Sequence, residues 1–415
     1  MTSWIAPHAT GPVGAEITVP GSKSATARAL VLSSLASGPG TITAGLRARD
    51  TSLMIAGLRA LGATIDDAGE RWQITPIQQV TSGNTIDCGL AGTVMRFLPP
   101  VAALGRGTTE FTGDEAASAR PMGALVDGLR QLGVGVSGTQ LPIQVTGPVS
   151  GQAVQIDSSA SSQFISALLL SGPRFPDGVS ITHHGDPIPS LPHIEMTVAA
   201  LRARGVQVDH TGSTWQVRPG PIVPRDEIIE PDLTTAAAFL AAALVTGGQV
   251  CLPGWPAHTT QPGTRILPIL EQMGAMAHFS EHGVTIRGSS EIAGIDIDLH
   301  ETSELTAVVA ALAALASGPS VIRGVGHIRG HETDRLAALS TEITALGGDC
   351  QATTDGLVIH PRPLHAGGFR TYADHRMAHA GALIGLRVAG VELDDVGCTS
   401  KTMPEFPATW QDMVR

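Results

Sequence analysis

A spacing of about seventy residues between recurring glycines constrains this chain more than any other feature of its sequence. A helix-like run that ends in a small residue and glycine, and then gives way to a β-like run, recurs six times. The marking glycines are Gly38, Gly105, Gly172, Gly247, Gly318 and Gly390, at intervals of 67, 67, 75, 71 and 72 residues. A second pattern, as in "LRALGATI", interleaves with the first at Gly62, Gly133, Gly205, Gly274 and Gly347. Two markers that stay in phase along the chain predict six structural units of similar size.

Each unit is expected to hold two helices, each ended by a C-cap glycine that leads into a strand. The longest interval contains "RPGPIVPRDEIIEPD" at 218–232, with four prolines and mixed charge. This stretch predicts a crossover between two domains, with three units before it and three after it.

Two helical stretches are apolar on nearly every side, "TTAAAFLAAALV" at 234–245 and "LTAVVAALAALA" at 305–316. A helix that is apolar all round is buried rather than amphipathic. The sequence therefore predicts an α/β protein in which the helices of each domain lie inside and the sheets outside.

Charge and composition narrow the class of partner. The formal net charge is -11 and aromatic residues make up 3% of the chain, which argues against nucleic-acid and anionic-membrane partners. The start of the chain lacks the features of a signal peptide, and the apolar runs fall short of the roughly 18 residues that span a bilayer. The cysteines form no CxxC pair, as expected for reduced thiols in a cytoplasmic protein: Cys88, Cys251, Cys350 and Cys398.

Lysine is rare in this chain, which contains two lysines against 24 arginines. Lys23 stands in "VPGSKSATARAL", where a strand gives way to a helix that is expected to begin near Ser24. The GxxxxGK[ST] pattern of a P-loop is not met, but the free N–H groups of a helix start still favour an anion. Arg28 lies one turn further on the same face. The alternative is a plain surface lysine; the rarity of lysine favours a specific role, such as proton transfer.

Other cations recur at equivalent positions of the repeat. Arg96 follows a glycine turn, Arg120 precedes a proline that fits the first turn of a helix, and Arg376 opens a helical stretch. An arginine near a helix N-terminus opposes the helix dipole and indicates an anion there. Together with Lys23, Arg28, Arg335 and Lys401, which is expected in a polar loop, these cations predict a site for small polyanions.

Two further stretches allow alternative interpretations. The serines of "DSSASSQF" at 157–164 are either N-caps or a neutral cradle for an anion. "GHETDR" is expected to place His331, Glu332 and Arg335 on the first turn of a helix, and it is not the HExxH motif of zinc proteases. His375 and His379 are spaced as a metal pair, but no other ligand lies at suitable spacing, so no metal site is expected.

With these motifs, the chain resembles the enolpyruvyl transferase family, and most closely its 5-enolpyruvylshikimate-3-phosphate (EPSP) synthase branch. "PGSKSATARAL", "AGTVMR", "ARPM", "SSQF", "HETDR", "DHRMA" and "CTSKTMPEF" occur in the family's order and spacing over essentially the whole chain. The resemblance implies two inside-out α/β domains, each of three βαβαββ repeats with buried helices and outer sheets. The implied domains are residues 21–230, and residues 1–20 with 231–415, joined by a double crossover near 20 and 230.

The same resemblance implies a reaction. The family transfers the carboxyvinyl group of phosphoenolpyruvate to the 5-hydroxyl of shikimate 3-phosphate and releases phosphate, in the shikimate pathway to chorismate and the aromatic amino acids. It implies small-molecule substrates, no cofactor, no metal and no nucleic acid, and the chain is expected to be a monomer. Glyphosate inhibits the family at the phosphoenolpyruvate site.

Site residues follow from the resemblance, position by position. The implied catalytic residues are Lys23, Glu304 and Glu332. The residues implied to bind shikimate 3-phosphate are Lys23, Ser24, Arg28, Ser161, Ser162, Gln163, Ser190, Glu304, His327 and His331. The residues implied to bind phosphoenolpyruvate are Lys23, Gly92, Arg120, Gln163, Arg335, Arg376 and Lys401.

Some positions depart from the family's commonest pattern. Glu304 replaces the usual aspartate and is one methylene longer, and His331 replaces the usual lysine beside the phosphate. Leu90 replaces the usual asparagine, His193 the usual tyrosine and Phe97 the usual proline. These departures bear on substrate affinity and on glyphosate sensitivity, and they leave the reaction class unchanged.

Two alternatives come from related folds. UDP-N-acetylglucosamine 1-carboxyvinyltransferase uses the same donor, but it usually carries a cysteine just before its "ARP" motif, where this chain has "GDEAASARP". A nucleic-acid-directed relative is disfavoured by the acidic charge and the scarcity of aromatic residues.

Overall fold

The computed structural model of the chain describes residues 3–415. Its internal contacts divide it into two compact units, one running up to Pro20 and then from Glu230 to Arg415, the other from Gly21 to Ile229. Each unit has a hydrophobic core of its own.

The Gly21–Ile229 unit contains three four-stranded sheets, in the orders β14-β3-β5-β4, β6-β7-β9-β8 and β10-β11-β13-β12. In each sheet the first two strands are parallel and the other neighbours antiparallel. Its strands are β3 (Gly40–Thr43), β4 (Thr64–Asp66), β5 (Arg71–Thr75), β6 (Thr85–Asp87), β7 (Thr108–Thr112), β8 (Gly135–Ser137), β9 (Ile143–Thr146), β10 (Ala153–Ile156), β11 (Val179–His183), β12 (Val208–Thr211), β13 (Thr214–Val217) and β14 (Asp226–Ile228). Its helices are α1 (Lys23–Ser34), α2 (Arg49–Ala60), α3 (Gly92–Ala102), α4 (Glu115–Ser118), α5 (Gly123–Gln131), α6 (Gln163–Ser171), the 3-10 helix η1 (Gly172–Arg174) and α7 (Pro192–Arg202).

The other unit contains two four-stranded sheets, β16-β17-β15-β2 and β18-β19-β21-β20, and a three-stranded sheet, β1-β23-β22. Its strands are β1 (Trp4–Ile5), β2 (Gly14–Glu16), β15 (Gln249–Pro253), β16 (Met276–Phe279), β17 (Gly283–Arg287), β18 (Asp296–Asp298), β19 (Ser320–Arg323), β20 (Asp349–Ala352), β21 (Leu357–His360), β22 (Gly367–Phe369) and β23 (Val391–Leu393). Its helices are α8 (Leu233–Thr246), α9 (Ile266–Gln272), α10 (Thr306–Ala314), α11 (Arg335–Ala345), α12 (His375–Arg387) and α13 (Phe406–Val414), with the 3-10 helices η2 (Pro262–Arg265), η3 (His300–Leu305), η4 (Gly326–Gly330) and η5 (Val396–Lys401).

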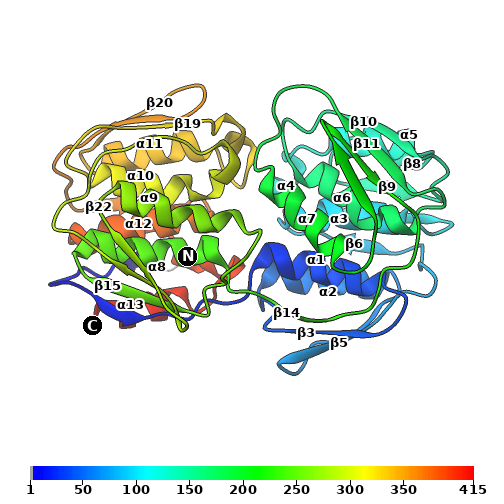
Figure 1. Ribbon diagram of the computed structural model, residues 1–415. Coiled ribbons are helices and arrows are strands. Elements are labelled where there is room, and N and C mark those ends of the chain that lie inside the picture. Colours follow the sequence, from blue (N-terminus) through cyan, green and yellow to red (C-terminus); the bar gives the residue numbers. More distant parts are fainter. Residues whose placement is uncertain (1–2) are drawn as a thin grey trace. The chain divides into compact units, whose positions relative to one another are not determined.

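The helices lie inside and the sheets outside, as predicted. In α8, 12 of 14 residues are buried, and every residue of α10 and of α3 is buried. The outer strands alternate instead between buried and exposed side chains, as in β5, because one face of each sheet covers the helices. Figure 1 shows α10 and α8 between the sheet that contains β19 and the sheet that contains β15. The α/β fold class is therefore confirmed. Five repeats have the βαβαββ order, and the sixth differs, since its sheet β1-β23-β22 has three strands in the described residues.

Two repeats take their first strand from a distant part of the chain. In the first repeat, β14 runs parallel to β3, and Thr41 donates a hydrogen bond to Asp226, 185 positions later. In the fourth repeat, β2 runs parallel to β15. In each unit, therefore, one sheet is completed by a strand that lies next to the boundary between the units in the sequence.

The interleaved glycines end helices as expected, but the first set does so only in part. Gly62, Gly133, Gly205, Gly274 and Gly347 all have φ between 76° and 111°, the left-handed conformation that favours glycine. In the first set only Gly247 and Gly390 have positive φ. The C-cap prediction is wrong at Gly38, Gly105 and Gly318, whereas Gly172 is the C-cap of α6 but has right-handed backbone angles. In two of these repeats the helix already ends at right-handed C-caps, Leu35 and Leu315, three residues before the glycine.

None of the helices formed by residues 3–415 is long and apolar enough to cross a membrane.

Packing around α8 gives a test of the buried-helix arrangement. Phe239 is 0% exposed, and its ring lies 5.4 Å from that of Phe406 and 5.3 Å from that of Trp410. We expect Phe239→Ala to lower the free energy of unfolding of this unit by about 3–5 kcal/mol, because the cavity is surrounded by rigid helices. Urea denaturation followed by tryptophan fluorescence measures the loss.

The matched control is Phe279→Ala, because Phe279 lies on outer strand β16 and is 61% exposed. Its effect should stay within about 0.5 kcal/mol. Equal denaturation midpoints for the two variants would contradict the arrangement.

Candidate active site

Arg28 links the start of α1 to the start of α7 within the Gly21–Ile229 unit. Its guanidinium donates from Nε to Thr197 Oγ1 at 2.8 Å and from one terminal nitrogen to the His193 carbonyl at 2.7 Å. The other terminal nitrogen donates to the Ser24 carbonyl at 2.9 Å, and the group lies over the ring of Phe97. Burial lowers the pKa of Arg28 to about 10, so the group stays charged at neutral pH.

Arg96 and Arg120 join the starts of α3, α5 and α6. Arg96 donates to Gln163 Oε1 at 2.8 Å and to the Pro121 carbonyl at 3.1 Å. Arg120 donates to the Leu90 carbonyl at 3.0 Å, and a Cβ on Gly92 would lie 2.9 Å from its guanidinium. Glycine at position 92 thus allows the guanidinium to approach the first turn of α3. The positive ends of several helix dipoles and two buried guanidinium groups meet here.

Lys23 is the first residue of α1 and is more accessible than these arginines. Its Nζ lies 3.6 Å from a carboxylate oxygen of Asp50, in the first turn of α2, and the two side chains are 21% and 5% exposed. The carboxylate gives the ammonium group a fixed, buried counter-charge.

The serines before α6 and α7 differ in their contacts with the helix starts. Ser162 occupies the N-cap position, but its side chain makes no capping hydrogen bond. Ser161 Oγ accepts instead from the backbone N–H of Gln163 at 3.3 Å and from Arg96 at 3.4 Å. Ser190, before α7, is buried and has φ of 50°, unusual for a residue other than glycine. Ser161 therefore contacts the first N–H of α6 as a cap would, while Ser162 does not, and both interpretations of these serines stay open.

In the other unit, a buried chain of ion pairs connects Lys401 to Asp374. Lys401 Nζ donates to Glu332 at 2.6 Å, and Arg335 donates to the second oxygen of Glu332 at 2.8 Å. Arg335 also makes a bidentate pair with Asp374, at 2.7 and 3.1 Å. All four side chains are at most 10% exposed. Because removing one member leaves a buried charge without its partner, the four groups stabilise one another.

Two local predictions here are wrong. His331 and Glu332 precede α11 instead of lying on its first turn, because the Asp334 side chain caps the N–H of Ala337 and the helix begins at Arg335. Lys401 ends the 3-10 helix η5 and is buried, although a polar loop was expected.

Asp374 connects this chain to the start of α12. It caps the helix by accepting from the N–H of Arg376, whose guanidinium donates to the Thr234 carbonyl in the first turn of α8. Burial alone would lower the pKa of Arg335, but Asp374 and Glu332 outweigh it and raise that pKa. For Arg376 burial prevails and lowers the pKa, with partial compensation from Asp232.

Histidines and Glu304 lie beside this cluster. The ring of His327 lies 5.7 Å from that of His300 and 6.0 Å from that of His331. Glu304, in η3, acts electrostatically on His327, Arg335 and Arg376. Burial lowers the pKa of His327 to about 4 in spite of Glu304, so this imidazole is neutral near pH 7.

His375 and His379, the spaced pair, lie in the core. Their rings are 5.9 Å apart, and the ring of His379 packs 4.6 Å from that of Phe406. Burial lowers the pKa of His379 well below its usual value. The packing and the lowered pKa together indicate that His379 is a neutral residue of the hydrophobic core.

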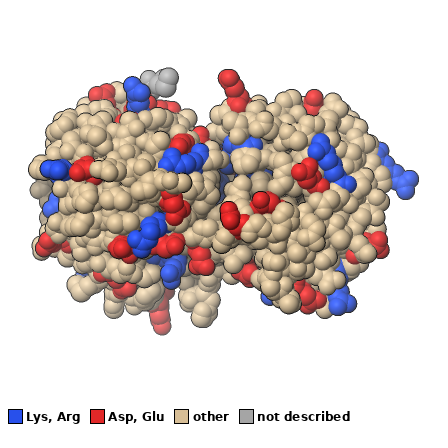
Figure 2. Space-filling view, turned by 90° about the horizontal axis from the view of Figure 1, so that it is seen from above, with Lys and Arg blue, Asp and Glu red and all other residues tan. Residues whose placement is uncertain are grey.

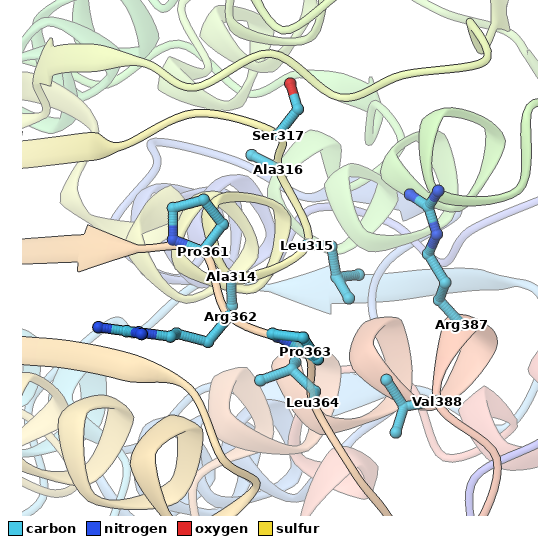
Figure 3. Close-up of a pocket in the computed structure, with 10 residues that line it drawn as sticks. All are labelled: Ala314, Leu315, Ala316, Ser317, Pro361, Arg362, Pro363, Leu364, Arg387 and Val388. Carbon is cyan, nitrogen blue, oxygen red and sulfur yellow. The ribbon is translucent and has the colours of Figure 1, made fainter.

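A separate pocket does not have the properties of an anion site. Its volume is about 440 Å³, and Figure 3 shows Arg362 and Arg387 on opposite sides of it. Ala314 and Arg387 in its wall are the last residues of α10 and α12. Helix C-termini carry the negative end of the dipole and disfavour anions. On the face that Figure 2 shows, lysine and arginine side chains stand in small groups among acidic ones.

The structure distributes the predicted site residues over the two units. The Gly21–Ile229 unit contains Lys23, Ser24, Arg28, Gly92, Arg120, Ser161, Ser162, Gln163 and Ser190, and the other unit contains Glu304, His327, His331, Glu332, Arg335, Arg376 and Lys401. Sequence reasoning missed Asp50 and Asp374. Asp374 looks like an ordinary N-cap, and no spacing signal marks Asp50.

Inside-out repeats with buried cations at the helix starts agree with the fold that the resemblance to the enolpyruvyl transferases implies. The comparisons with known proteins agree. A family model described as EPSP synthase (3-phosphoshikimate 1-carboxyvinyltransferase) matches residues 7–410, and the chain therefore belongs to the EPSP synthase family.

Individual relatives support this assignment. The chain is 54% identical to a 3-phosphoshikimate 1-carboxyvinyltransferase of Mycobacterium ulcerans (strain Agy99), covering 99% of this chain and 97% of the relative. A solved EPSP synthase from Acinetobacter baumannii is similar at a TM-score of 0.81 and 25% identity, covering 99% of this chain and 98% of that one. A second structure from the same organism, at 24% identity and a TM-score of 0.78, supports the fold.

The lowered pKa of His327 predicts a pH-dependent stability. Because the unfolded histidine titrates near pH 6.5 and the folded one near 4, the unfolded state binds more protons between these values, and stability falls as the pH is lowered through this window. Full loss of this contribution amounts to roughly 3 kcal/mol. Denaturation midpoints at pH 7.5 and pH 4.5 should therefore differ more for the wild type than for His327→Asn. An equal difference in the two proteins would show that His327 does not titrate in this way.

Proposed function

We propose that this chain transfers the enolpyruvyl group of phosphoenolpyruvate to the 5-hydroxyl of shikimate 3-phosphate, with release of phosphate. The observation that carries the proposal is the burial of cations at helix starts in a protein of net charge -11. Arg28, Arg96, Arg120, Arg335 and Arg376 are each at most 6% exposed. Such groups interact strongly with anions, since a partly dehydrated pair at 4 Å gains about 4 kcal/mol against about 1 in water.

The Gly21–Ile229 unit supplies groups suited to shikimate 3-phosphate. We assign the carboxylate of this substrate to Ser24 and Arg28, and its phosphate to Ser161, Ser162 and Ser190. Arg28 already donates to three protein oxygens, so only its remaining N–H groups serve the substrate. Gln163, which Arg96 orients, lies at the start of α6. His327 and His331 of the other unit are assigned to the same substrate.

Phosphoenolpyruvate is assigned to Arg120 and the first turn of α3 at Gly92, and to Arg335, Arg376 and Lys401. In this structure Glu332 accepts from both Lys401 and Arg335. An incoming anion therefore competes with a carboxylate for the same donors. This competition makes Glu332 available for proton transfer when the substrate is bound.

Three groups are proposed to move protons. Protonation of C3 of phosphoenolpyruvate makes C2 cationic, and the 5-hydroxyl attacks C2 as Glu304 accepts its proton. The tetrahedral intermediate then loses a proton from C3 and expels phosphate. Lys23 and Glu332 carry the proton to and from C3, which is general acid–base catalysis. Alignment of the two reactants supplies about 7–11 kcal/mol of the acceleration.

This chemistry needs neither a metal nor an organic cofactor, because the donor already carries an activated enol and a phosphate leaving group. We propose further that the enzyme acts as a monomer in the cytoplasm on these small molecules and not on nucleic acid. The acidic net charge supports the exclusion of nucleic acid.

Phosphate release distinguishes the proposed activity from its nearest alternative. We expect release with phosphoenolpyruvate and shikimate 3-phosphate, and none with phosphoenolpyruvate and UDP-N-acetylglucosamine. Turnover of the sugar nucleotide alone would assign the chain to UDP-N-acetylglucosamine 1-carboxyvinyltransferase activity instead.

Replacement of Lys23 by arginine tests its role in proton transfer. Arginine keeps the charge beside Asp50 but does not release a proton at neutral pH. We expect Lys23→Arg to fold normally and to lose kcat by at least about 100-fold, a typical general acid–base contribution. Lys401→Arg, which keeps a donor for Glu332, is the matched variant and should mainly raise KM for phosphoenolpyruvate. A Lys23→Arg enzyme with near-normal kcat would contradict the role.

A further inference from the structure

Three potential metal ligands meet on the outer face of the sheet β16-β17-β15-β2. Cys251 of β15 pairs in register with Glu16 of β2, and His282 lies in the turn that precedes β17. The Nε2 atom of His282 lies 2.9 Å from Glu16 Oε2. One ligand atom of each of the three side chains lies within 4.8 Å of the other two. Within residues 3–415, no other group of three such side chains comes this close.

The backbone holds all three residues in place. Strand alternation buries Val250 and Leu252, so Cys251 between them faces outward and is only half-buried. The Cys251 carbonyl accepts from the N–H of Ile17, next to Glu16. The His282 carbonyl accepts from the N–H of Gly254 at 2.8 Å, which ties the turn to the end of β15. The three Cα positions are therefore set by sheet and turn hydrogen bonds, and binding an ion requires side-chain rotation alone.

The donor set is selective in its chemistry. A thiolate, an imidazole and a carboxylate are the side chains that bind Zn²⁺, at about 2.3, 2.0 and 2.1 Å. Calcium and magnesium require oxygen ligands instead. Once the thiol loses its proton, the thiolate and the carboxylate together balance the charge of a divalent cation. Three protein ligands leave one tetrahedral position for water.

We propose that Glu16, Cys251 and His282 form a zinc-binding site on this sheet. The ion would join the N-terminal strand β2 to β15 and to the β16–β17 turn, and so fasten the strand that completes the fourth repeat. The site shares no residue with the groups assigned to the reaction. The proposal revises the expectation of no metal site. The sequence did not predict this site because Glu16 and His282 are 266 positions apart, so no ligand spacing indicates them.

Cobalt and zinc titrations of the whole, chelator-treated protein test the proposal. We expect one equivalent of Co²⁺ to produce a sulfur-to-cobalt charge-transfer absorption that Zn²⁺ abolishes by displacement. Cys251→Ser should lack this absorption and bind zinc at least about 100-fold more weakly, because the loss of a ligand costs no less than the loss of a residue that orients one. His282→Gln should weaken zinc binding but keep the thiolate signal. The matched control is Cys398→Ser, which removes another half-buried thiol and should behave like the wild type.

Thermal unfolding gives an independent readout. Zinc should raise the melting temperature of the wild type and of Cys398→Ser, and should leave that of Cys251→Ser unchanged. Turnover should be the same in all these proteins. Absence of the thiolate absorption in the wild type, or its persistence in Cys251→Ser, overturns the proposal. A zinc-induced rise in melting temperature that is equal in Cys251→Ser and the wild type also overturns it.

Discussion

Helix starts that meet within each unit are the constraint on which the rest of this structure depends. Each start presents free N–H groups and the positive end of a helix dipole. Cations that are buried at these starts are repelled by the dipoles and by one another. The protein compensates locally: Asp374 caps α12 and pairs with Arg335, Glu332 joins Arg335 to Lys401, and Asp50 lies beside Lys23. Elsewhere carbonyl oxygens accept from the guanidinium groups. A site organised in this way is suited to multiply charged anions.

The two points at which the chain passes between the units are fixed by short-range contacts. Asp232, which caps α8, donates its N–H to the Pro20 carbonyl at 2.8 Å, so the two connecting segments are joined inside one unit. On the other side of the boundary, a Cβ on Gly21 would lie 2.0 Å from the Ala44 carbonyl, so only glycine fits there. Lys23 follows two residues later, which places a reactive group on a well-defined part of the backbone.

The side chains of the candidate site could be predicted from the sequence to different degrees, and the reasons are physical. Cations at helix starts can be recognised in the sequence as candidate site residues, because an arginine at such a position opposes the helix dipole. Their acidic partners do not, since aspartate is an ordinary residue at a helix N-terminus. The neutral state of His327 depends on how deeply the fold buries it, and pairings such as Glu16 with His282 depend on strand order. Neither the depth at which His327 is buried nor the strand order can be predicted from the spacing of residues along the chain.

The sequence by itself determined the number of repeats, the burial of the apolar helices and the class of ligand, because periodicity and composition act along the chain. It also led to the family through motifs in a fixed order. Only the tertiary structure decided that β14 and β2 complete repeats far from them in sequence. It likewise decided that Arg335 shares its charge with Glu332 and Asp374, and that Lys401 is buried. These features arise from contacts between distant segments, and no local preference specifies them.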